Sequence, residues 1–138
     1  MDQPLSITIR SPTDQPILID AVEGYLAERD VSAAVRNRLL VVLDELVANV
    51  LSHGYAPEEP PFLRLSVDVS AAGVLAELAD AGLPFDPLQH PPPDTTSDLE
   101  DRPVGGLGAH LVRELTGEAR YSRVEGENRL SLWWPVDR

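Results

Sequence analysis

The chain has 138 residues, with 23 acidic and 11 basic side chains and a formal net charge of -12 at pH 7. All the basic residues are arginines, because the sequence contains no lysine, and it contains no cysteine either. These counts argue against a nucleic-acid-binding surface and exclude a Schiff-base enzyme, a lysine-dependent phosphate loop, disulfides and thiolate metal ligands.

The composition is that of one folded domain, with 43% hydrophobic and 25% charged residues. A chain of this length buries a substantial core, so we expect a single domain over residues 1–138. The N-terminal residues lack the basic and apolar segments of a signal peptide, and no run reaches the ~18 apolar residues of a membrane helix. We therefore expect a soluble cytoplasmic protein that binds neither membranes nor, directly, nucleic acids.

The first half of the sequence predicts one strand and two helices. Residues 5–9 alternate between apolar and polar side chains, which is typical of a half-buried strand. Residues 17–28 repeat their apolar side chains with a helical period. A longer amphipathic helix is predicted over residues 32–53, ending before Gly54, a common helix stop.

The second half predicts four strands, one long loop and one short helix. The loop, residues 84–103, is rich in proline and acidic residues, and loops of that length in compact domains are usually functional or disordered. The helix is predicted at 107–116, and the strands at 62–69, 74–79, 119–124 and 129–134. Helices and strands do not alternate strictly. This order predicts the α+β class, a two-layer α/β sandwich with a mixed, mostly antiparallel sheet and helices on one face.

The long helix carries the first group of candidate functional residues. Glu45, Asn49, Ser52 and His53 fall on one narrow arc beside the apolar stripe. A carboxylate and a carboxamide one turn apart can face a single water or metal ion, and Mg²⁺ prefers such oxygen ligands. A solvated polar edge of an amphipathic helix explains the same pattern.

The second candidate segment follows the predicted strand 74–79. Asp80 extends this apolar strand, where a carboxylate requires a donor from a ligand or from the backbone. Gly82 permits a positive φ angle or the close approach of a ligand to the backbone. An ordinary turn leaving a strand is the alternative interpretation of the same residues.

The third segment places three glycines, Gly105, Gly106 and Gly108, at the start of a predicted helix. Free backbone N–H groups at a helix N-terminus bind phosphate oxygens well, and glycine lets a ligand come close to them. A flexible hinge is the alternative. The position of these glycines after a long loop favours a phosphate-binding role.

Taken together and in this order, the three segments resemble the nucleotide-binding motifs of the GHKL superfamily, the histidine-kinase-like ATPases. Residues 84–87, 105–113 and 127–130 look like those of bacterial anti-sigma-factor serine/threonine kinases within it. The resemblance extends from Ile7 to Trp134. It implies the Bergerat-type ATP-binding fold, with a lid loop at about residues 87–104.

The resemblance also implies a role for each candidate residue in binding ATP and Mg²⁺. Asn49 would be the Mg²⁺ ligand, and Glu45 would be the general base or water-orienting carboxylate for transfer of the γ-phosphoryl group. Asp80 would accept a hydrogen bond from the adenine amino group, and Gly82 would let the base approach.

The glycine segment is expected to contact the phosphates. By the same resemblance, backbone N–H groups of Gly105, Gly106 and Gly108 would cradle them, and Leu107 belongs to this nucleotide-binding segment. Arg102 precedes the glycines and is the basic side chain of the proline-rich lid, so we expect it to contact a phosphate. Metal, backbone and arginine would together replace the missing lysine.

The function that this resemblance implies is that of an anti-sigma regulatory factor with ATP-dependent serine/threonine protein kinase activity. Such a protein binds a sigma factor and phosphorylates an anti-anti-sigma partner of the STAS type, and homodimers are expected by resemblance alone. A catalytically weak nucleotide-binding module that sequesters its partner without phosphorylating it is the alternative. A small α/β domain without a nucleotide site is the third interpretation.

Overall fold

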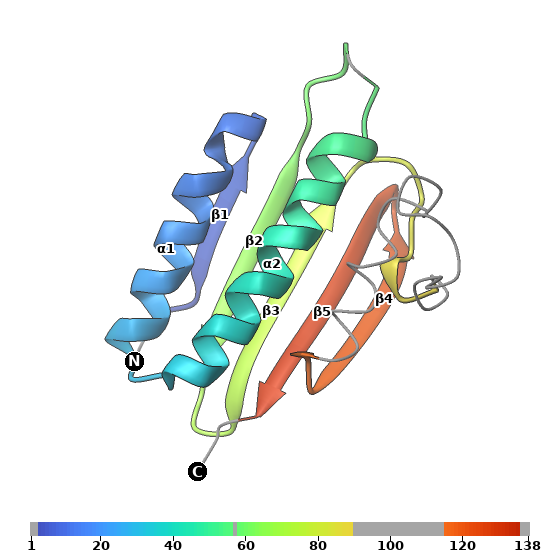
Figure 1. Cartoon of the computed structure of the whole chain (residues 1–138). Helices are drawn as coiled ribbons and strands as arrows, with labels where there is room; N and C mark the ends of the chain where they lie inside the picture. The colour runs from blue at the N-terminus through green and yellow to red at the C-terminus, as the bar shows by residue number, and fades with distance from the viewer. Residues whose placement is uncertain (1–2, 57, 90–114, 136–138) are drawn as a thin grey trace, which may run out of the picture.

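A computed structural model describes residues 3–56, 58–89 and 115–135 of the chain (Figure 1). These residues form a five-stranded sheet, two long helices and two short 3-10 turns. In chain order the elements are β1 (Leu5–Ile9), η1 (Pro12–Asp14), α1 (Gln15–Glu28), α2 (Ala33–His53), β2 (Leu63–Val69), β3 (Gly73–Asp80), η2 (Pro87–Gln89), β4 (Glu118–Val124) and β5 (Glu127–Pro135).

The strands lie in the order β1-β2-β3-β5-β4, and each pairing between these described strands is antiparallel. The last strand of the chain, β5, therefore lies between β3 and β4. Helices α1 and α2 lie side by side on one face of the sheet (Figure 1). The predicted fold, a mostly antiparallel sheet with helices on one face, is confirmed.

The core fills the space between the two helices and the sheet. Apolar side chains at a helical spacing on α1 and α2 meet the inward-facing side chains of the sheet. Every second residue of β2 and β5 is buried, and β3 is buried over most of its length. The largest fully buried side chains are Leu18, Val22, Leu26, Leu39, Val42, Leu43, Val47, Leu63, Leu65, Val67, Val74 and Leu132. No helix in the described part of the chain is both long and apolar enough to cross a membrane.

Helix α2 begins and ends as its sequence predicts. The Ser32 side chain accepts a hydrogen bond of 3.2 Å from Val35 N, which caps the first turn. At the other end, Gly54 N donates to Val50 O over 2.9 Å. The predicted strands agree with β1 to β5 to within two residues at each end. The predicted helix 107–116 and the lid loop 87–104 lie mostly outside the described residues, which include only 87–89 and 115–116 of them.

Replacing a core leucine of α2 should destabilise the protein strongly. Leu43 is 0% exposed and lies in the core cluster, so Leu43→Ala should lower the free energy of unfolding by about 2–5 kcal/mol. Val41, on the same helix, is 47% exposed, and Val41→Ala should change it by about 0.5 kcal/mol or less. Urea unfolding followed by circular dichroism measures both, and equal losses would contradict this packing.

Candidate functional site

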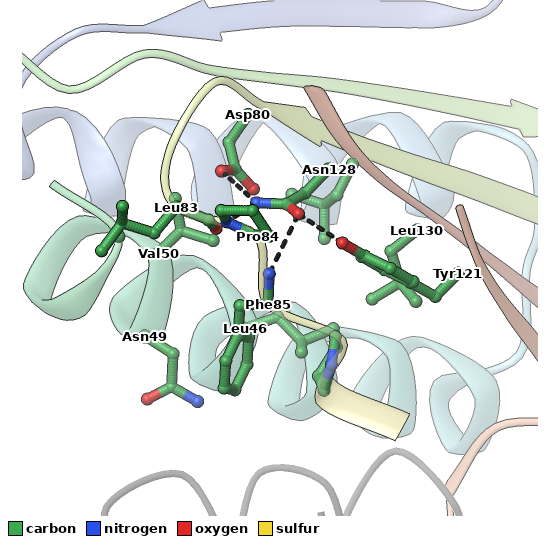
Figure 2. Close-up of a pocket in the computed structure, with 13 residues that line it drawn as sticks. Leu46, Asn49, Val50, Asp80, Leu83, Pro84, Phe85, Tyr121, Asn128 and Leu130 are labelled. Atoms are coloured by element: carbon green, nitrogen blue, oxygen red, sulfur yellow. Dashed lines mark hydrogen bonds between the residues drawn. The ribbon is translucent and has the colours of Figure 1, made fainter. Parts of the chain in front are cut away.

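A pocket of about 370 Å³ lies between α2 and the ends of β3, β4 and β5. Its lining is mostly apolar, with few polar side chains among the thirteen residues drawn in Figure 2. Pockets of this size and lining are typical of small-molecule sites. The lining residues are Leu46, Asn49, Val50, Gly54, Leu78, Asp80, Leu83, Pro84, Phe85, Pro87, Tyr121, Asn128 and Leu130.

The polar end of the pocket is formed by Asp80 and Asn128, which face each other across β3 and β5. Each is only 7% exposed, and they are the two buried polar side chains among the described residues. Both continue an inward-facing apolar row, since Asp80 follows Leu78 on β3 and Asn128 precedes Leu130 on β5. The alternation of the two strands therefore points a carboxylate and an amide into the same interior space.

Hydrogen bonds hold this pair in place. One carboxylate oxygen of Asp80, Oδ1, accepts from Gly82 N over 2.9 Å and from Asn128 Nδ2 over 3.0 Å. Asn128 also contacts Leu83, Phe85 and Tyr121, so the pocket walls are linked to its polar end (Figure 2). A buried carboxylate with this many partners is a fixed acceptor rather than a free side chain.

Burial also changes the acidity of Asp80. Loss of hydration raises the pKa of its carboxyl above the ordinary value of 3.8. The hydrogen bonds from Asn128 and Gly82, and the positive charge of Arg123, act in the opposite direction, and the charge of Glu127 adds to the rise. The ionised form of Asp80 is therefore less favourable in the folded protein than in the unfolded chain.

The segment after β3 is fastened to the end of α2. Leu83 N donates to Gly54 O over 3.0 Å, and Ala81 N donates to Tyr55 Oη over 2.9 Å. A Cβ atom on Gly82 would lie 2.5 Å from Gly54 O, so only glycine permits this contact. Gly82 is buried beside the pocket but does not line it. Its close approach is therefore to the protein's own backbone.

The α2 candidates occupy different positions. Asn49 lines the pocket and lies apart from the Asp80 cluster (Figure 2). Glu45 lies one turn earlier on the same helix face and is partly buried, but neither it nor the exposed Ser52 lines the pocket. Asp44, the residue before Glu45, faces α1 instead, because its Oδ1 accepts a hydrogen bond from Gln15 Nε2 over 2.8 Å.

A bound metal ion would depend on Asn49. Among the described residues, no three His, Cys, Asp or Glu side chains cluster as a metal site would require. Mg²⁺ needs few protein ligands when phosphate oxygens and water complete its octahedron, and the amide oxygen of Asn49 is a suitable hard ligand at the pocket. A single amide oxygen therefore fits Mg²⁺ that is bound together with phosphate better than a metal ion bound by protein side chains alone.

The phosphate-binding candidates are Arg102, Gly105, Gly106, Leu107 and Gly108, and all of them lie outside the described residues. Their roles stay predictions. Asn49 and Asp80 are the predicted site residues that the structure brings into one pocket.

Asn128, Tyr121 and the apolar walls of the pocket were not predicted as site residues from the sequence. A signal for Asn128 exists, because it occupies the same strand phase as Leu130, Leu132 and Trp134, all of which point inward. A polar residue in an apolar strand phase requires buried partners, just as Asp80 does. The apolar walls carry no comparable signal, because a pocket-lining leucine has the same sequence pattern as a core leucine.

A helix-covered antiparallel sheet with a buried carboxylate at a pocket between helix and sheet defines an α+β domain with a candidate small-molecule site. The family described as the histidine kinase-like ATPase domain matches residues 11–134 of the chain. The chain therefore belongs to the histidine kinase-like ATPase domain family, which confirms the resemblance drawn from the motifs.

Individual proteins of known name or known structure also resemble the chain over most of its length. The chain is 32% identical over 129 residues to the serine/threonine-protein kinase BtrW of Bordetella bronchiseptica, covering 93% of this chain and 88% of that protein. A solved structure of the RsbU and RsbW domains of Rv1364c from Mycobacterium tuberculosis has a TM-score of 0.72 and 18% identity, over 99% of this chain and 33% of that one.

A more distant structural relative is the blue-light activated histidine kinase EL346 of Erythrobacter litoralis. It has a TM-score of 0.56 and 17% identity, over 78% of this chain and 32% of that one. This chain thus spans about a third of each of these two solved chains. At such identities the two structures support the fold alone.

The raised pKa of Asp80 makes a testable link between pH and stability. Because the folded protein binds this proton more tightly than the unfolded chain, ionising Asp80 costs stability as pH rises from about 3.8 through the raised value. The free energy of unfolding of the wild type, minus that of Asp80→Asn, should therefore fall across this window and then level off. Urea unfolding at a series of pH values measures the difference.

Asp68→Asn is the matched control, since it removes one negative charge from an exposed position on β2. Its difference from the wild type should lack the decline seen for Asp80→Asn. A difference for Asp80→Asn that rises with pH would contradict the burial effect.

Proposed function

We propose that this protein is an anti-sigma regulatory factor with ATP-dependent serine/threonine protein kinase activity. It binds a sigma factor and phosphorylates an anti-anti-sigma partner of the STAS type. Membership of a histidine kinase-like ATPase family supports nucleotide binding, and 32% identity to a serine/threonine-protein kinase supports protein phosphorylation. The observation that carries the proposal is the buried acceptor Asp80 at the end of an apolar pocket.

Adenine matches this pocket in shape and in hydrogen-bonding chemistry. The apolar side chains of Leu46, Val50 and Leu130 provide surface for a flat aromatic base. Asp80 accepts hydrogen bonds when ionised and so pairs with the 6-amino group of adenine, but not with the 6-oxo group of guanine. Gly82 supports this contact by holding its loop against the end of α2.

The triphosphate side of the site is assigned to α2 and to the glycine segment. Mg²⁺, held by Asn49, would neutralise phosphate charge when it is bound. Glu45, one turn from Asn49, orients or deprotonates the attacking hydroxyl of the protein substrate. The backbone of Gly105, Gly106, Leu107 and Gly108, with Arg102, contacts the phosphates.

The charge of the chain agrees with a protein partner that is itself basic. A net charge of -12 favours association with a DNA-binding factor such as a sigma factor, and it disfavours direct binding of nucleic acid. The proposal includes a homodimer, on the family resemblance alone.

Base recognition by Asp80 gives a direct binding test. In Asp80→Asn, an amide N–H replaces one acceptor oxygen, so the affinity for Mg-ATP should fall by about tenfold or more while that for Mg-GTP does not fall. Isothermal titration calorimetry measures both affinities. Asp68→Asn, the exposed control on β2, should bind both nucleotides like the wild type. Equal losses for ATP and GTP would argue against contact between Asp80 and the base.

Phosphoryl transfer gives the second test. Glu45→Gln should lower the rate of phosphate transfer from Mg-ATP to a STAS-type anti-anti-sigma protein of the source organism by about a hundredfold or more. Its ATP affinity should stay within about twofold of the wild type, because Glu45 does not line the pocket. Mass spectrometry of the partner locates the phosphoserine or phosphothreonine.

Asp44→Asn is the matched control, because this neighbouring carboxylate bonds to Gln15 of α1. It should transfer phosphate at the wild-type rate. Unchanged transfer in Glu45→Gln would refute the proposed base. A wild-type protein that binds ATP and its partner without any transfer would instead be the partner-sequestering module.

A further inference from the structure

The amide of Asn128 uses its complete hydrogen-bonding capacity. Its Nδ2 donates to Asp80 Oδ1 over 3.0 Å and to Leu83 O over 2.8 Å. Its Oδ1 accepts from Phe85 N over 3.1 Å and from Tyr121 Oη over 2.5 Å. An asparagine side chain has two donor hydrogens and two acceptor lone pairs, so no capacity is left over.

These partners fix the orientation of the amide. Leu83 O can only accept and Phe85 N can only donate, so Nδ2 must face Leu83 and Oδ1 must face Phe85. A flipped amide would place a donor against the Phe85 N–H group and an acceptor against the Leu83 carbonyl. Such mismatches are costly at a residue that is only 7% exposed.

The fixed amide determines what Asp80 offers to a ligand. Asp80 Oδ1 is occupied by Asn128 Nδ2 and Gly82 N. Within the described part of the chain, no hydrogen bond is formed to the other oxygen, Oδ2. Because both N–H hydrogens of Asn128 are already donated, this polar end of the pocket presents an acceptor and no spare amide donor.

We propose that Asn128 is a positioning residue that sets the base specificity of the pocket. By holding Asp80 through Oδ1, it reserves Oδ2 for the amino group of a 6-aminopurine and denies the 6-oxo group of guanine a donor. This inference rests on the proposed function, since it requires that the pocket bind a purine nucleotide.

Asn128 also positions the walls that would enclose the base. Its bonds to Leu83 O and Phe85 N hold the segment after β3 over the pocket, and Tyr121 adds a bond from β4 (Figure 2). Three residues of the pocket wall and the carboxylate of Asp80 are therefore held by the one amide of Asn128. A change at Asn128 should alter the discrimination between bases as well as the affinity.

Charged and titratable groups around Asp80 and Asn128 affect how a pH-dependent experiment on this pair is interpreted. Arg123 of β4 and Glu127 of β5 exert opposite charge effects on Asp80 of β3. Burial raises the pKa of the Tyr55 phenol, which follows α2, and the charge of Asp80 adds to the rise. Tyr121 of β4 donates a hydrogen bond to Asn128. Burial moves the pKa of the Tyr55 phenol further above neutral pH, so a new titration near neutral pH in a variant would not belong to this phenol.

Asn128→Asp tests the proposal most directly. It places a second carboxyl about 3.0 Å from Asp80 Oδ1, and two carboxyls at that distance share a proton. The pair therefore does not carry two negative charges, and a proton that lies on Asp80 Oδ2 offers a donor to a 6-oxo group. The preference for Mg-ATP over Mg-GTP, measured by calorimetry, should fall by about tenfold or more. It should also depend on pH more steeply than in the wild type, because the pair of carboxyls exchanges a proton with solvent.

Tyr121→Phe is the milder variant, because it removes one donor to Asn128 Oδ1 and keeps the ring. It should reduce the preference for Mg-ATP by roughly two- to tenfold, and it decides the question if Asn128→Asp does not fold. Ser131→Ala is the matched control, since Ser131 lies on β5 but outside both the core cluster and the pocket. Circular dichroism and thermal melting confirm folding of each variant.

The outcomes separate this inference from the proposed function. A wild-type protein that binds neither nucleotide overturns both. A wild-type protein that prefers Mg-ATP, with folded Asn128 and Tyr121 variants that keep the same preference and pH profile, overturns the positioning role alone. Loss of preference in both variants but not in Ser131→Ala supports it.

Discussion

The contact between Asp80 and Asn128 is the constraint on which the site depends. A carboxylate at an interior position of a sheet is costly unless donors satisfy it, and here a backbone N–H and a side-chain amide do so. The cost is only partly offset, because the pKa of Asp80 stays above its ordinary value. The folded protein thus retains a buried carboxylate whose ionised form lowers its stability.

Helix α2 joins the core and the site in one element. Its apolar stripe, with Leu39 and Leu43 fully buried, fixes the helix against the sheet. The same helix brings Asn49 to the pocket and ends at Gly54, which anchors the segment after β3. Packing energy in the core therefore positions polar groups at the site, and the site needs few interactions of its own to stay in place.

The sequence predicts most of the fold because its strands and helices carry clear periodic patterns. Residues 5–9 and 32–53, for example, form the predicted strand and helix to within a residue. It also predicts that Asp80 is a special residue, because a carboxylate extends an apolar strand. The contact with Asn128 was not predicted, since nothing local states that β5 pairs with β3 rather than only with β4. Pairings across long separations depend on the whole core.

The position of β5 in the sheet affects the order in which parts of the protein can fold during synthesis. Asp80 and Asn128 are 48 residues apart in sequence, yet they are direct neighbours between β3 and β5. On the ribosome, β1, β2, β3 and both helices emerge before the strand that completes the pocket, which must then insert between β3 and β4. A nascent chain therefore contains both long helices of the described structure before it can form the contact between Asp80 and Asn128. The polar end of the pocket is thus complete only once β5 has taken its place in the sheet, and the proposed ligand would bind only the finished molecule.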